Sequence, residues 1–172
     1  ATVLITDKRL RGVWQEPASR SEWLKATIVG PGDPVLRAER DTPPELRGAL
    51  DELIDRLRHL AARQIPAEWW EERDGVRYGE IVRPLESIGA YIPGGRYPLP
   101  STLMMTVIPA QEAGVKTVSA ASPALSPATL GVAGILNVDN FFHMGGAQAI
   151  AAFAFGTDTV PRAQRIVGPG NI

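Results

Sequence analysis

The 172-residue sequence contains no cysteine, which excludes disulfide bridges, thiolate metal sites and a cysteine nucleophile. Its formal net charge of -1 gives no electrostatic reason to expect binding to nucleic acid or to an anionic membrane. No apolar run approaches the roughly 20 residues that a membrane span needs. The N-terminal apolar run, Val3–Ile5, is interrupted at once by charged residues and does not resemble a signal peptide. We therefore expect a soluble cytoplasmic protein.

Histidine is nearly as scarce, with His59 and His143 as the only two. His59 falls in a helical pattern without a second ligand three or four residues away, which argues against a metal site. His143 stands just before a double glycine, where it either ends a strand or contacts a cofactor. The sequence therefore nominates no catalytic residue and no metal ligand.

Composition is typical of a globular protein, with 44% apolar and 22% charged residues. We expect two regions. Residues 1–82 form an irregular and helical N-terminal segment with one clear helix at about 44–63, and residues 83–172 form a Rossmann-like domain. Within the first region, Thr2–Thr6 could form a short strand and Ser21–Ala26 part of a helix.

The helix at 44–63 is predicted from apolar residues that recur at three- and four-residue spacing. It should dock on the rest of the chain through Leu50, Leu53, Leu57 and Leu60. After Ile65-Pro66 ends this helix, Asp74-Gly75 is a strong two-residue turn signal and predicts a β-hairpin.

From Arg83 onwards, short apolar runs alternate with helical segments and with glycine or proline breaks. This order is typical of a parallel sheet with right-handed crossovers, so the predicted fold class is α/β: a Rossmann-like, mostly parallel sheet with flanking helices. Pro109 should kink or break its helix. The predicted strands cover 88–92, 115–120, 140–144 and 165–167, and the predicted helices begin near Ser101, Ser126 and Gly146.

Two glycine turns follow predicted strands, Gly145-Gly146-Ala147-Gln148 and Gly168-Pro169-Gly170-Asn171. Taken locally, each fits an ordinary close-packed turn. Glycine also lets a phosphate approach the backbone at a helix N-terminus, and the carboxyl ends of parallel strands lie on one edge of a sheet. We therefore expect a nucleotide at this edge, although the dinucleotide fingerprint G-x-G-x-x-G is absent after the first strand of the sheet.

Several blocks stand in an order that identifies a family. From about Pro66 to Ile172 the sequence resembles the N-terminal half of histidinol dehydrogenase. The blocks are Arg83-Pro84-Leu85-Glu86, Gly89-Ala90-Tyr91-Ile92-Pro93-Gly94-Gly95, Pro98-Leu99-Pro100-Ser101-Thr102, Ile108-Pro109-Ala110, Ala113-Gly114-Val115-Lys116, Gly145-Gly146-Ala147-Gln148-Ala149-Ile150-Ala151-Ala152, Gly156-Thr157 and Ile166-Val167-Gly168-Pro169-Gly170-Asn171.

The resemblance implies a zinc-dependent homodimeric enzyme of histidine biosynthesis, which oxidises L-histidinol to L-histidine in two NAD-dependent steps. It implies NAD contacts at Tyr91, Gln148 and Asn171. An aromatic face with a hydroxyl, and amides that both donate and accept, suit a dinucleotide. Without the resemblance, Tyr91 would fit a partly buried strand aromatic. If the topology holds, the three side chains should line one crevice.

This sequence differs from the family pattern at several points, and these differences leave alternative functions open. The family's zinc ligands and its catalytic Glu-His pair correspond to positions after Ile172, and residues 1–45 do not align with the family. His143 stands where a basic residue such as Arg is expected. The alternatives are a non-catalytic or truncated paralogue that binds a nucleotide or a protein partner, and a dehydrogenase of the same family for another small alcohol.

Overall fold

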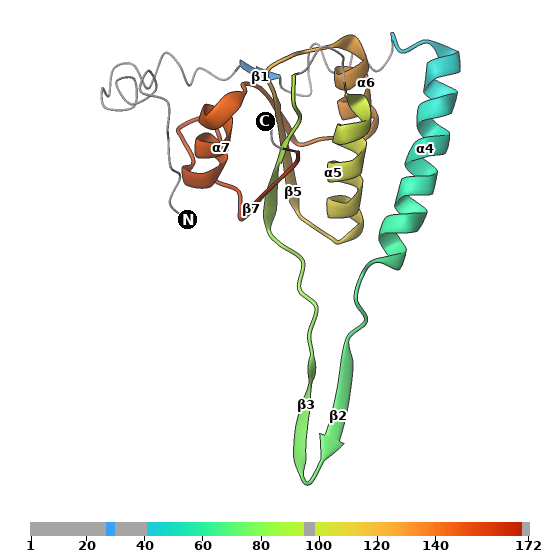
Figure 1. The fold of residues 1–172 in the computed structure, drawn as a ribbon, viewed down its shortest axis with the longest axis vertical. Coiled ribbons are helices and arrows are strands. Elements are labelled where there is room, and N and C mark those ends of the chain that lie inside the picture. Colours follow the sequence, from blue (N-terminus) through green and yellow to red (C-terminus); the bar gives the residue numbers. More distant parts are fainter. Residues whose placement is uncertain (1–26, 30–40, 95–98, 170–172) are drawn as a thin grey trace.

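The computed structural model describes residues 27–29, 41–94 and 99–169. The strand and helix expected at Thr2–Thr6 and Ser21–Ala26 lie outside these residues. The main sheet has the strand order β1-β6-β5-β4-β7 (Figure 1). Its strands are β1 (Thr27–Val29), β4 (Ser87–Tyr91), β5 (Thr117–Ser122), β6 (Asn140–His143) and β7 (Arg165–Val167). The helices are α4 (Pro44–Arg63), α5 (Pro100–Glu112), α6 (Pro127–Ile135) and α7 (Gly146–Phe155).

The sheet is mostly parallel, as the alternation of elements predicts. Strands β4, β5, β6 and β7 pair in parallel, with Ile88 opposite Val118 and also opposite Arg165. Strand β1 pairs antiparallel with β6 at one edge. This edge strand was not predicted, because three residues are too few to show an alternating pattern. The α/β fold class is confirmed.

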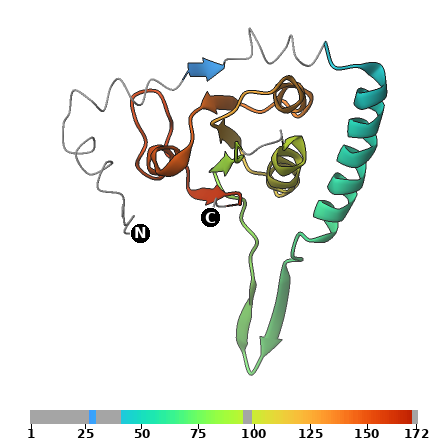
Figure 2. The ribbon, with the colours of Figure 1, turned by 45° about the horizontal axis from the view of Figure 1, so that its top comes forward.

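The two faces of the sheet carry separate apolar clusters, and alternate residues of β4 enter each of them. Ile88 and Ala90 belong to the larger cluster, which includes residues of α4, α5 and α6. Tyr91 belongs to the smaller cluster around α7, where Gly89 also lies against the ring of Phe153. Figure 2 shows α7 on one side of the sheet, α5 and α6 on the other, and α4 outermost. This alternation is what a strand buried on both faces requires.

Helix α4 occupies the predicted residues, but its docking face differs in part. Leu50 is 6% exposed and Leu57 packs at the margin of the core, as expected. Leu53 and Leu60 are 37% and 55% exposed, so their predicted docking is wrong. At 100° per residue they lie roughly 70° round the helix from the buried row, which runs through Leu50, Ile54, Leu57 and Ala61. Leucine spacing alone could not separate the two rows.

Two local features test the proline and glycine signals. Helix α5 continues through Pro109 to Glu112, so of the predicted kink or break, the break does not occur. The predicted hairpin is present as β2 (Trp69–Arg73) and β3 (Val76–Glu80), joined by Asp74 and Gly75 with φ of 53° and 73°. Both turn residues are left-handed, as a two-residue hairpin turn requires.

The β2–β3 hairpin projects from the body that contains the main sheet (Figure 1). Side chains of the two strands contact one another. Trp69 packs edge to face on Tyr78, and the Arg77 guanidinium lies 4.9 Å from the centre of a Trp70 ring. Trp69 and Trp70 are each about half exposed.

Within the described residues, no helix is long and apolar enough to cross a membrane.

Candidate functional site

Four turns meet at the carboxyl edge of the parallel strands. Pro93-Gly94 follows β4, Pro123-Ala124 follows β5, Gly145-Gly146 follows β6 and Gly168-Pro169 follows β7. These strands are parallel neighbours in the sheet, so their carboxyl ends lie on the same side. Such an edge is where open α/β sheets bind their ligands.

Tyr91 and Gly146 are joined by a hydrogen bond across this edge. Tyr91 is the last residue of β4 and is 7% exposed. Its hydroxyl oxygen accepts a hydrogen bond from the backbone N–H of Gly146 at 3.2 Å. Gly146 is the first residue of α7, where backbone N–H groups have no partner within the helix. The tyrosine thus fixes one N–H at the mouth of this helix.

Gln148 also lies against this glycine. It stands in the first turn of α7, and its Oε1 lies 2.7 Å from the position a Cβ would take on Gly146. The structure therefore brings two of the predicted residues, Tyr91 and Gln148, together at Gly146. The third, Asn171, lies outside the described residues.

Pro123 is a site residue that the sequence patterns did not indicate, because it lies just beyond the strand predicted at 115–120. A Cβ on Gly145 would lie 2.4 Å from Cβ of Pro123, and a Cβ on Gly94 would lie 2.5 Å from its Cγ. The proline ring therefore sits against both glycines, where a side chain at either would collide with it. A proline directly after the central strand, between two glycine-bearing turns, was the available signal.

Gly168 closes the edge at β7. Its φ is 131°, and a Cβ would lie 2.2 Å from the carbonyl oxygen of Tyr91. Only glycine can adopt this backbone conformation without strain and also pass so close to β4. The Gly168 turn thus packs closely on the backbone of Tyr91, which fits the ordinary close-packed turn that its local sequence also allows.

Replacing Gly146 tests the site directly. We expect Gly146→Val to lower the free energy of unfolding by about 1–3 kcal/mol, because a β-branched residue is strained at a φ of +64°. The new side chain would also displace the Gln148 amide. Chemical denaturation measures the effect, with Gly48→Val as control, since a Cβ on exposed Gly48 meets nothing within 4 Å. Equal losses in both variants would contradict the expectation.

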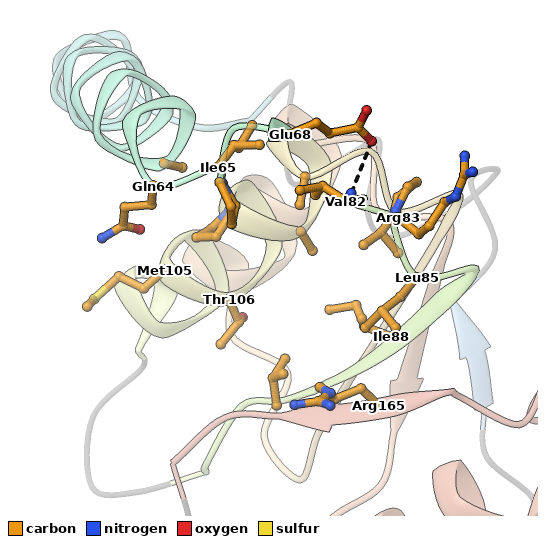
Figure 3. Close-up of a pocket in the computed structure, with 18 residues that line it drawn as sticks. Gln64, Ile65, Glu68, Val82, Arg83, Leu85, Ile88, Met105, Thr106 and Arg165 are labelled. Atoms are coloured by element: carbon orange, nitrogen blue, oxygen red, sulfur yellow. Dashed lines mark hydrogen bonds between the residues drawn. The ribbon is translucent and has the colours of Figure 1, made fainter. Parts of the chain in front are cut away.

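A hollow lies away from the glycine edge, between α5, the end of α4 and the base of the hairpin (Figure 3). Its volume is about 710 Å³ and apolar side chains make up most of its wall. Met105, Ile65 and Val82 line it, together with Arg83 and Arg165. It includes none of the predicted site residues, so it is separate from the glycine edge.

The two histidines occupy different parts of the fold. His59 is exposed on α4, while His143 ends β6 and its ring Nε2 lies 3.1 Å from the carbonyl oxygen of Pro123. In the described part of the chain, no three or more His, Asp or Glu side chains gather in a group that could hold a metal ion.

Comparison with known proteins gives a consistent family. A family model described as histidinol dehydrogenase matches residues 23–172, so the similarity begins well before Pro66, and the expectation that residues 1–45 do not align with the family is wrong for residues 23–45. A histidinol dehydrogenase from Natronomonas pharaonis is 44% identical over 142 residues, which cover 81% of this chain and 34% of that protein. One from Methylococcus capsulatus is 44% identical over 152 residues, which cover 86% of this chain and 35% of that protein. The chain spans about a third of the length of such relatives.

A solved structure agrees with these sequences. The crystal structure of histidinol dehydrogenase from Elizabethkingia anophelis superposes with a TM-score of 0.83 at 30% sequence identity. The match covers 99% of this chain and 44% of that one. The resemblance seen in the sequence motifs is thus confirmed at the level of fold.

Proposed function

The chain belongs to the histidinol dehydrogenase family, and from that premise we propose that it supplies the NAD-binding part of an enzyme that oxidises L-histidinol to L-histidine. The observation that carries the proposal is the meeting of Tyr91 and Gln148 at Gly146. These residues come from separate segments of the sequence and converge at the helix mouth that follows a parallel strand.

The residues present fit a dinucleotide. Gly146 is exposed and has no side chain, and the backbone N–H groups that follow it in the first turn of α7 suit a phosphate. Because the Tyr91 hydroxyl accepts the N–H of Gly146, its own hydrogen is free to be donated elsewhere, for example to a ligand oxygen. We assign Tyr91, Gln148 and Asn171 to cofactor binding. NAD, when bound, accepts the hydride from the substrate, and this chain's residues orient it.

We extend the proposal to the whole protein by family resemblance: a homodimeric, cytoplasmic enzyme of histidine biosynthesis whose two successive oxidations use NAD and zinc. The described residues do not fit zinc, because they contain no suitable group of ligands. This chain's part is therefore to position NAD, and proton transfer belongs to other residues of the whole protein. The net charge of -1 supports a small-molecule substrate over nucleic acid.

The proposal is tested by titrating the chain with NAD while following amide hydrogen exchange. We expect NAD to slow exchange at residues 144–148. Tyr91→Phe removes the acceptor for the Gly146 N–H and should weaken NAD binding about five- to tenfold. Tyr78→Phe is the matched control, since that tyrosine lies on the projecting hairpin.

Protection elsewhere, with none at the glycine turns, would contradict the NAD assignment. If NAD protects no residue, the non-catalytic alternative gains over the enzyme reading for this chain. Equal weakening by Tyr91→Phe and Tyr78→Phe would show that the hydroxyl of Tyr91 has no special part in binding.

A further inference from the structure

The loop after β5 is held at its first residue by both neighbouring strands. The Pro123 ring lies against Gly94 on the β4 side and Gly145 on the β6 side. Gly145 immediately precedes Gly146, where Tyr91 and Gln148 meet. Any movement of Pro123 would therefore displace the turn that is proposed to bind the cofactor.

The hydrogen bonds that this loop makes within itself are local. Proline has no N–H to donate, so Pro123 can be hydrogen-bonded only through its carbonyl oxygen. Buried Ser122 accepts the N–H of Ala124 at 3.3 Å and donates to its carbonyl at 3.0 Å, which shapes the loop locally. Neither bond joins the loop to β6.

His143 supplies that link. It is the register partner of Ser122 on the adjacent strand, so its side chain starts beside the loop. Its Nε2 lies 3.1 Å from the Pro123 carbonyl oxygen. A carbonyl can only accept, so Nε2 must carry the hydrogen that forms this bond. The imidazole thus ties the β5 loop to the strand that leads into Gly145 and Gly146.

We propose that His143 is a positioning residue for the dinucleotide edge: by donating to the Pro123 carbonyl, it seats the proline ring against Gly145 and so sets the entry of α7. The role rests on the proposed NAD function, but the positioning itself is a property of the chain without ligand. His143 acts through Pro123, and no contact with the cofactor is required.

The test compares three variants of the full chain. His143→Ala removes the donor, while His143→Gln keeps an N–H donor at a similar reach. His59→Ala removes the other histidine, which is exposed on α4. Amide exchange at residues 144–146 is measured without ligand, and the NAD dissociation constant is measured separately.

We expect His143→Ala to speed exchange at 144–146 several-fold and to raise the NAD dissociation constant about five- to tenfold. His143→Gln should restore both, and His59→Ala should change neither. If the unmodified chain binds no NAD, the proposed function fails, yet faster exchange in His143→Ala with rescue by His143→Gln would still support positioning.

Unchanged exchange in His143→Ala would overturn the inference, whatever NAD does. Failure of His143→Gln to restore the turn would do so as well, since it would mean that the ring, and not the donated hydrogen bond, matters. Faster exchange without any change in NAD affinity would refute the link to the cofactor.

Discussion

Incubated with L-histidinol, NAD and Zn²⁺, the 172-residue chain is expected to form no NADH above background. Oxidising the alcohol needs a base to take the hydroxyl proton, and the family resemblance assigns both that base and the zinc ligands to positions after Ile172. Both histidines of the chain are exposed: His59 lies on α4, and His143 is hydrogen-bonded to Pro123. We therefore expect the 172-residue chain to have no histidinol dehydrogenase activity at all.

The assay has a matched positive control, the full-length histidinol dehydrogenase of Methylococcus capsulatus, of which this chain's match covers 35%. Under identical conditions that protein should generate NADH, whose absorbance reports the reaction. Turnover by the 172-residue chain at a rate proportional to its concentration would show that it contains a complete catalytic centre.

The second large effect is expected in helix α4. Leu50→Ala should lower the free energy of unfolding by about 2–5 kcal/mol, because the side chain is buried in the core cluster that joins α4 to α5 and a cavity would remain. Leu60→Ala, ten residues along the same helix, should cost within about 0.5 kcal/mol, since most of this side chain is in solvent.

Denaturant unfolding of the two variants gives the comparison, and the shared helix and substitution cancel differences in helix propensity. Similar small losses would mean that α4 does not pack on α5 in solution. A large loss in Leu60→Ala would show that this leucine is covered there, against the exposure seen in the structure.

Elements marked by local chemistry could be predicted from the sequence. Asp74-Gly75 fixed the hairpin because both residues tolerate a positive φ. Ser126, near which a helix was predicted to begin, caps α6 by accepting the N–H of Thr129, and Pro127 stands at the first helical position. The parallel order of β4 to β7 followed from the alternation of strands with helices.

What the sequence could not show depends on contacts between distant segments. Leu50 and Leu60 differ in burial only because α5 covers one row of α4 and not its flank. The seat of Pro123 between two glycines requires knowing that β5 lies between β4 and β6. Tyr91 and Gln148 could be named through the family motifs, but the hydrogen bond that joins Tyr91 to Gly146, 55 residues away, is visible only in three dimensions.

The strand order also has a consequence for folding during synthesis on the ribosome. Strand β4 pairs on one side with β5, which soon follows it in the sequence, and on the other with β7, which is synthesised only after α7. Until β7 has been synthesised, Ile88 to Ala90 have one row of backbone N–H and C=O groups without its partner strand. Synthesis therefore passes through a stage in which β4 is an edge strand, and such unpaired strand edges promote aggregation.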